Sequence, residues 1–189
     1  EDKFVADGHG INRRDVMYND FILVGPPDDP AKVAGLTSIA VAMQRIARSG
    51  APFVSRGDDS GTEKLELRLW AEVGISPKSG REPWYFSAGT GMGEVLMLSG
   101  SKQAYTLSDR ATYAAFRQKT GLRIVVEGDA KLFNPYGVIA VNPARHPQVQ
   151  FEGAMKFIDW LTSAKGQQRI ADFKVAGAQM FFPSASGSR

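Results

Sequence analysis

The chain has 189 residues, of which 43% are hydrophobic and 23% are charged, and this ordinary globular composition argues against disorder. Its 23 basic and 20 acidic residues leave a formal net charge of +3 without a basic stripe, so nucleic acid is not an expected partner. The chain has no cysteine, which excludes disulfides, thiolate ligands and cysteine nucleophiles, and no apolar run long enough to span a membrane.

The first fifty residues are expected to form a helical turn, a loop, a strand and a helix. Residues 1–16 are polar and contain glycine, which favours a short helical turn followed by a loop. The run Phe21–Val24 is apolar at every position and is bounded by turn residues, so it predicts a strand buried on both faces. Apolar residues then recur at helical spacing from Ile39 to Ala47, and Gly50 is the expected end of that helix.

The stretch Ser55–Thr62 connects the short apolar run Pro52–Val54 to a helical pattern from Glu63 to Val73. A loop between a strand and a helix start directs free backbone N–H groups and the positive end of a helix dipole toward one place. Ser60 and Glu63 also have the spacing of a capping box, which places the start of the helix at this loop.

An oxyanion is one expected occupant of this loop. The backbone N–H groups of Ser60, Gly61 and Thr62 would donate to it, the Ser60 and Thr62 hydroxyls would add hydrogen bonds, and Arg56 would supply positive charge. The alternative is a well-capped helix preceded by a solvated loop. Local physical chemistry favours neither interpretation over the other.

A second unit of strand, glycine-rich loop and helix follows. Trp84–Phe86 is the expected strand, Ser87–Gly93 is the loop, and a short apolar helix continues to Leu98. If this loop faces the same cleft as the first, Thr90 and the backbone near Gly91 provide further donors. Otherwise its glycines only let the helix pack closely on the strand. Their spacing does not match a dinucleotide-binding fingerprint.

The remaining sequence continues to alternate strands with helices, which predicts an α/β fold with mixed or parallel sheets. The expected strands are 103–106, 122–126 and 137–141, and the expected helices follow Ser108–Asp109, span 151–161 and run from a Ser163 cap through Phe173. His9 and His146 are interpreted as separate, solvent-exposed loop residues, so we expect no metal site and no catalytic set.

Several segments together resemble the tungstate-binding proteins of ABC transporters. They are Met17–Gly25, Phe53–Thr62, Ala88–Met92, Ala104–Arg110, Asn134–Pro143 and Phe157–Gly166. The resemblance extends over nearly the whole chain, and its eight-residue loop is specific. It implies a type II periplasmic-binding fold, in which two α/β lobes are joined by two crossing strands and the ligand lies in the interlobe cleft.

This resemblance assigns the crossing strands and the lobes. Asn19–Val24 would lead out of lobe one, and Gly137–Val141 would return to it. Lobe one would then comprise residues 1–26 and 134–189, and lobe two residues 27–133. The implied ligand-binding residues are Arg56 and Thr62 first, then Ser60 and the Gly61 backbone, together with Ser55, Thr90 and Gly91.

The implied function is capture of tungstate, or of a related tetrahedral oxyanion such as molybdate, and its delivery to an ABC permease. No catalysis, cofactor or directly bound metal ion is implied. The implied location is periplasmic or extracellular, with a lipid anchor on the precursor as one option. The alternative function is an oxyanion-sensing module of a regulator. An enzyme for phosphorylated or sulfated substrates would need a general base near Arg56, and the sequence offers none.

One departure from the family pattern concerns the start of the chain. Family members open with a threonine- and serine-rich turn between a strand and a helix, which supplies oxyanion donors from lobe one, and the sequence at Glu1 shows none. We therefore expect lobe one to be incomplete, with an exposed apolar edge where the missing part would dock. We also expect this polypeptide alone to bind tungstate weakly or not at all.

Overall fold

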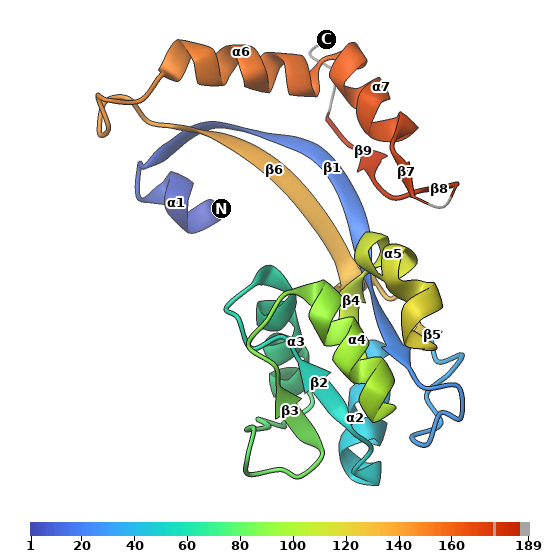
Figure 1. Ribbon diagram of the computed structural model, residues 1–189. Helices are drawn as coiled ribbons and strands as arrows, with labels where there is room; N and C mark the ends of the chain where they lie inside the picture. The colour runs from blue at the N-terminus through green and yellow to red at the C-terminus, as the bar shows by residue number, and fades with distance from the viewer. Residues whose placement is uncertain (176, 186–189) are drawn as a thin grey trace. The chain divides into compact units, whose positions relative to one another are not determined.

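The computed structural model describes residues 1–175 and 177–185 (Figure 1). The chain divides into two compact units: unit 1 comprises Glu1–Asn19 and Asn134–Arg189, and unit 2 comprises Asp20–Phe133. The chain passes from unit 1 to unit 2 within strand β1 (Gly10–Gly25) and returns at the start of strand β6 (Phe133–Val141), and these two strands pair with each other.

Unit 2 is a mixed α/β unit, as the sequence predicts. Strand β1 pairs antiparallel with both β4 and β5, whereas β2 and β3 pair in parallel, with Phe53 opposite Tyr85. Its elements in chain order are α2 (Ile39–Ser49), β2 (Phe53–Ser55), α3 (Gly61–Glu72), β3 (Tyr85–Ser87), α4 (Met92–Lys102), β4 (Thr106–Asp109), α5 (Arg110–Thr120), β5 (Arg123–Val126) and the 3-10 turn η1 (Ala130–Leu132).

The apolar run Phe21–Val24 is buried on both faces, which confirms the prediction. Successive side chains of a strand point to opposite faces. Phe21 and Leu23 lie in one apolar cluster with the buried residues of α2 and α3, while Ile22 and Val24 lie in a second cluster with those of α4. Because helices cover both faces of this part of β1, every position of the run is apolar.

The loop predicted for the first sixteen residues is wrong beyond Gly10, because β1 begins there. The polar side chains of this part of β1 are exposed or half-buried and form ion pairs. Arg13 pairs with Glu1 at 2.9 Å and with Asp15 at 2.7 Å, and Arg14 pairs with Asp159 at 2.8 Å. Strand β1 pairs with β6 and β9, and the sequence of this part lacks the apolar alternation that indicates a strand.

Unit 1 also contains α1 (Asp2–Ala6), α6 (Phe151–Thr162), α7 (Ala164–Asp172) and the short strands β7 (Lys174–Val175), β8 (Ala178–Gln179) and β9 (Phe182–Pro183). Strand β9 pairs antiparallel with β1, with Tyr18 opposite Phe182. The Ser163 hydroxyl accepts the Gly166 N–H at 3.2 Å and caps α7, as its sequence predicts.

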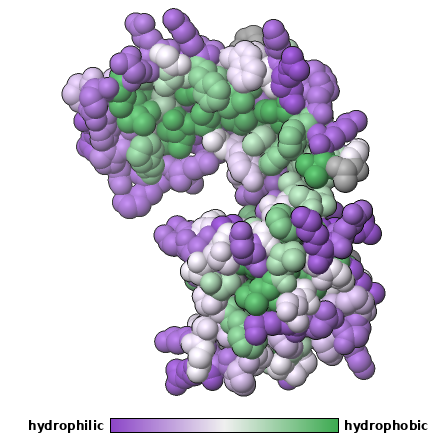
Figure 2. All heavy atoms as spheres, viewed as in Figure 1, coloured by the Kyte–Doolittle hydropathy of each residue, from purple (hydrophilic) through white to green (hydrophobic). Residues whose placement is uncertain are grey.

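Unit 1 leaves a group of large apolar side chains exposed, and Figure 2 shows a broad hydrophobic region on the viewed face of this unit. Phe157 is 57% exposed, Phe173 51% and Trp160 46%. Trp160 and Phe173 also line an apolar pocket of about 280 Å³. These side chains give unit 1 exposed apolar surface, and docking of a further segment on it stays a prediction. Among the described residues, no helix combines the length and apolarity needed to cross a membrane.

Several element boundaries differ from the predicted ones, and strand β6 begins at Phe133, four residues before the predicted Gly137. Helix α4 extends four residues beyond Leu98, and it ends where Gln103 adopts a left-handed conformation with φ 49°. The strand predicted at 103–106 begins instead at Thr106, because Ala104 and Tyr105 form the buried connection after that helix. Such boundaries depend on where the chain turns into the core, and apolar periodicity does not show this position.

Candidate oxyanion-binding site

The two loops that the sequence singles out lie side by side at the carboxyl ends of β2 and β3. Ser55 is paired with Ser87 at the ends of these parallel strands. The Ala88 N–H donates to the Ser55 carbonyl at 3.0 Å, and the Thr90 N–H donates to the Arg56 carbonyl at 3.3 Å. The carboxyl ends of parallel strands in open α/β sheets are where ligands bind.

Gly57 permits this close approach of the two loops. Its φ is +62°, in the left-handed region, and a Cβ atom built on it would lie 1.9 Å from the Ser87 Oγ atom. A side chain at this position would be strained by the backbone conformation and would force the Ser87 hydroxyl to move. The glycine that interrupts the polar loop is required by packing between two segments thirty residues apart in the chain.

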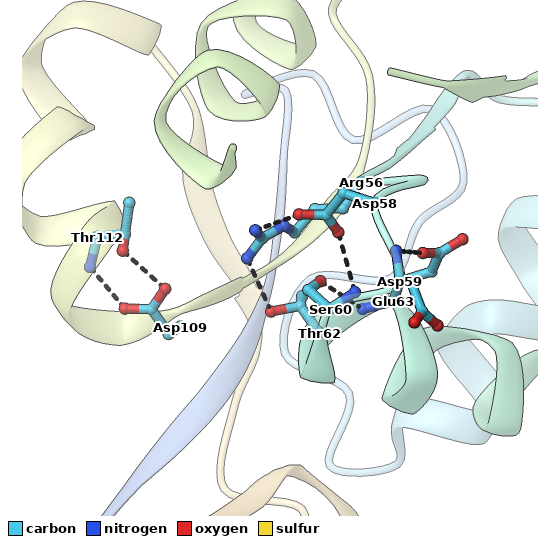
Figure 3. A network of polar contacts seen from close by, with 8 residues as sticks. All are labelled: Arg56, Asp58, Asp59, Ser60, Thr62, Glu63, Asp109 and Thr112. Atoms are coloured by element: carbon cyan, nitrogen blue, oxygen red, sulfur yellow. Dashed lines mark hydrogen bonds and ion pairs between the residues drawn. The ribbon is translucent and has the colours of Figure 1, made fainter. Parts of the chain in front are cut away.

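Helix α3 begins at Gly61, directly after Ser60, as the capping-box spacing predicts (Figure 3). The Ser60 hydroxyl accepts the Glu63 N–H at 3.3 Å. The other half of the box differs, because the Glu63 carboxylate accepts the N–H of Asp59 rather than that of Ser60.

The Ser60 N–H donates to Asp58 Oδ1 at 3.2 Å, so it is already engaged and is not free for a ligand as expected. Gly61 and Thr62 are the first two residues of α3. At the first turn of a helix the backbone N–H groups have no carbonyl within the helix to which they can donate. These two groups are therefore the backbone donors that the start of α3 offers. Thr62 is 7% exposed, so its side chain belongs to the buried face of the helix.

Arg56 is held beside the start of α3 by two contacts. Its Nη2 forms an ion pair with Asp58, and its Nη1 lies 3.5 Å from Thr62 Oγ1. The Ser60 hydroxyl, and after it Arg56, lower the pKa of the Asp58 carboxyl below its ordinary value, against the opposing effect of desolvation. Asp58 therefore stays ionised and orients the guanidinium, whose side chain is 20% exposed.

Two polar atoms in this loop are buried without a partner. Among the residues that the structure describes, three side-chain nitrogen or oxygen atoms are buried without a hydrogen bond, namely Ser55 Oγ, Arg56 Nε and Asn19 Nδ2. Buried polar atoms of this kind are rare in folded proteins, and a ligand is one reason for them. Two of the three belong to adjacent residues at the start of the loop.

The second loop contributes less to the site than the sequence suggests. Thr90 is half-buried and close to Arg56 through its backbone, and Gly91 is the residue that precedes α4. A Cβ atom on Gly91 would lie 2.9 Å from the Glu94 carboxylate, which therefore already lies against this helix start. A carboxylate at this position satisfies the positive end of the helix and disfavours a second anion.

Glu66, which sequence reasoning missed, lies one turn further into α3 and is only 2% exposed. Its Oε1 accepts the Tyr85 hydroxyl at 2.7 Å and the Trp70 Nε1–H at 3.0 Å. Desolvation by burial raises the pKa of its carboxyl to about 7, although the nearby Ser55 hydroxyl and the hydrogen bonds from Tyr85 and Trp70 oppose this effect. A single glutamate in a helical pattern gives no indication of burial, because most glutamates on helices are exposed.

This buried carboxyl makes the stability of the protein depend on pH. A pKa that is raised in the folded state stabilises the fold at low pH, and this stabilisation is lost as the pH rises from about 4.5 to about 7. We expect the free energy of unfolding to fall by roughly 2–3 kcal/mol more in the wild type than in Glu66→Gln between about pH 5 and about pH 8. Chemical denaturation at the two pH values measures this difference, and parallel profiles would contradict it.

His9 and His146 are not the separate, exposed residues that their sequence positions suggest. Both are half-buried, and His9 Nδ1 lies 3.1 Å from His146 Nε2, although 137 positions separate them in the chain. Pairing of two distant loops cannot be read from a single sequence. No group of three or more His, Cys, Asp or Glu side chains suited to a metal ion occurs among the described residues.

Comparison with known proteins places this geometry in a family. The family model of the PBP superfamily domain matches residues 1–165. The chain belongs to this superfamily. This match confirms the predicted type II periplasmic-binding fold. The residues that the family model matches include the parallel strands β2 and β3 and helix α3, which follows β2.

Individual members of the PBP superfamily confirm the resemblance found in the sequence. The tungstate-binding protein TupA of Peptoclostridium acidaminophilum is 48% identical over 98% of this chain and 65% of its own length. The solved tungstate-binding protein TupA of Desulfovibrio alaskensis G20 is 44% identical with a TM-score of 0.81, covering 98% of this chain and 75% of that one. The solved tungstate ABC transporter protein of Geobacter sulfurreducens is 51% identical with a TM-score of 0.77, covering 91% and 72%.

The chain is shorter than the curated relatives that it matches. It spans 55%, 65% and 68% of the lengths of three such relatives.

Proposed function

We propose that this chain binds tungstate, or a related tetrahedral oxyanion such as molybdate, at the start of α3, and that the chain by itself does so weakly, as its sequence predicts. The proposal rests on two buried polar atoms without a partner, Ser55 Oγ and Arg56 Nε, in the loop that leads to the free N–H groups of Gly61 and Thr62. Ser60 would contribute its hydroxyl, and Thr90 and Gly91 would border the anion from the second loop. An oxyanion supplies the acceptors that this set of donors lacks.

The chemistry of the donors favours a dianion over a neutral ligand. A hydrogen bond to a charged partner contributes about 1.5–3 kcal/mol, roughly twice a neutral one, and the Arg56 guanidinium, which Asp58 orients, is such a charged donor. A set of donors without acceptors also suits a ligand that accepts hydrogen bonds on all sides, as a tetrahedral oxyanion does.

Within a transporter, the proposed role is to capture the anion outside the cytoplasm and deliver it to an ABC permease. Relatives that are named as tungstate-binding proteins, and the solved tungstate transporter protein, support this role. We further propose that residues 1–26 and 134–189 form one lobe and residues 27–133 the other, and that the precursor is retained by a lipid anchor. The chain would bind and release the anion without covalent chemistry.

Titration of the ¹⁵N-labelled chain with tungstate up to millimolar concentration tests the proposal, because amide shifts detect weak as well as tight binding. We expect saturable shifts centred on Gly61 and Thr62, reproduced by molybdate and absent with chloride at equal ionic strength. Saturable shifts of other residues, with the amide signals at the start of α3 unchanged, would show that the anion binds elsewhere. No saturable shift with tungstate or molybdate would overturn the proposed function.

A further inference from the structure

The Ser55 hydroxyl lies near the buried Glu66 carboxyl, at the start of the loop that forms the candidate anion site. Alternation along β2 places Ser55 on the same face as Phe53, which packs in the cluster that also contains Trp70 and Tyr85. Ser55 is 1% exposed and is close enough to Glu66 and Tyr85 to lower the pKa of the Glu66 carboxyl and of the Tyr85 phenol. Its Oγ atom nevertheless forms no hydrogen bond.

Thr62 connects the same two places along the helix. Residues four positions apart lie on one face of a helix, so Thr62 lies directly above Glu66 on the buried face of α3. Thr62 Oγ1 faces Arg56 on the ligand side at 3.5 Å, while Glu66 is bonded to Tyr85 and Trp70 on the core side. A ligand at the start of α3 is therefore separated from a buried carboxyl by only one helical turn.

We propose that Glu66 is a positioning residue for the oxyanion and that the site takes up one proton, on the Glu66 carboxyl, when it binds a dianion. This inference rests on the proposed function and adds its regulation by pH. The ligand class is a tetrahedral oxyanion that stays doubly charged at neutral and alkaline pH, such as tungstate.

The first reason for the coupling is the position of the Ser55 proton. When Glu66 is ionised, its carboxylate attracts the Ser55 hydroxyl proton, so Ser55 presents a lone pair rather than a donor to the anion. When Glu66 is protonated, this attraction is lost, and the Ser55 O–H is free to donate to the ligand. Protonation thus supplies the site with one more donor.

The second reason is charge. An ionised Glu66 and a dianion are like charges about one helical turn apart, with buried protein between them, and such charges repel strongly where water is excluded. Desolvation already raises the pKa of Glu66 to about 7. A dianion at the start of α3 raises it further, so binding above neutral pH draws a proton onto the carboxyl.

Among the side chains around Glu66, its own carboxyl is the group that we expect to gain or lose a proton near neutral pH. Tyr85 on β3 is a hydrogen-bond donor whose own pKa is raised, and Glu63, on α3 with Glu66, is only half-buried. From β4, Asp109 is engaged by the N–H and hydroxyl of Thr112 at 2.8 and 2.7 Å. The buried side chains of α2 are all apolar, namely Ile39, Ala42, Met43 and Ile46.

The test is calorimetric titration of the chain with tungstate from about pH 6 to about pH 9, in buffers of different ionisation enthalpy, which gives affinity and proton uptake together. We expect the wild-type Kd to weaken up to about tenfold per pH unit above about pH 7, with close to one proton taken up per anion at about pH 8. Glu66→Gln cannot ionise and should bind with a flat pH profile and no Glu66-linked uptake.

Two further variants separate positioning from structure. Tyr85→Phe removes a donor that lowers the pKa of Glu66, so it should move the weakening of binding to higher pH. Glu72→Gln changes an exposed glutamate of the same helix, paired with Lys131, and should keep the wild-type profile. Wild-type binding without pH dependence or proton uptake, or an unchanged profile in Glu66→Gln, would overturn this inference alone. No tungstate binding at any pH would overturn the proposed function as well.

Discussion

Replacement of Arg56 by alanine is expected to lower the affinity for tungstate by roughly 100-fold or more while leaving the fold intact. The change removes the positive charge of the site and the buried Nε donor, and charge-assisted hydrogen bonds contribute about 1.5–3 kcal/mol each. It also releases Asp58, whose carboxylate would then face the anion without its partner. Calorimetric or amide-shift titration with tungstate measures the loss.

Two control variants make this result specific. Arg68→Ala removes an exposed arginine from α3 itself and should leave the affinity within about twofold, since exposed charges are screened by salt. Arg56→Lys keeps the charge but loses the planar fork, so its affinity should lie between those of wild type and Arg56→Ala. An Arg56→Ala variant that binds tungstate as the wild type does would remove Arg56 from the proposed site.

The largest loss of stability is expected for Trp70→Ala. The Trp70 ring is fully buried, with ring centroids 5.2 Å from Phe53, 5.5 Å from Trp84 and 6.5 Å from Tyr85. Truncation of a buried tryptophan costs about 3–5 kcal/mol, because it removes the burial of the ring and leaves a cavity. It also removes the Nε1–H donor of the buried Glu66. Chemical denaturation followed by far-ultraviolet circular dichroism measures the decrease.

Trp160→Ala is the matched control for this change. Trp160 is 46% exposed on α6, where it stacks only on the exposed Phe157 ring among the ring contacts of the described residues. Its truncation should cost less than about 1 kcal/mol, as surface substitutions generally do. Equal destabilisation by the two substitutions would show that the Trp70 cluster is not the packed centre of unit 2.

Sequence reasoning located the candidate site because its main features are local. Ser60 caps α3 three residues before Glu63, and the polar loop follows β2 directly, so both are visible within a dozen residues. The assignment of Ser55, Arg56 and Thr62 to a ligand remains a prediction for the binding experiments. The expected Ser60 N–H donor was wrong because Asp58, two residues earlier, accepts it.

What the sequence determined by itself was whatever depends on neighbours along the chain: the caps of α3 and α7, the doubly buried run Phe21–Val24 and the α/β class. Only the tertiary structure decided the contacts between distant segments. It packed Gly57 against Ser87, paired His9 with His146, and buried Glu66 against Tyr85. The physical reason is that apolar periodicity and capping act over one or two turns, whereas burial of a polar group depends on what the fold brings against it.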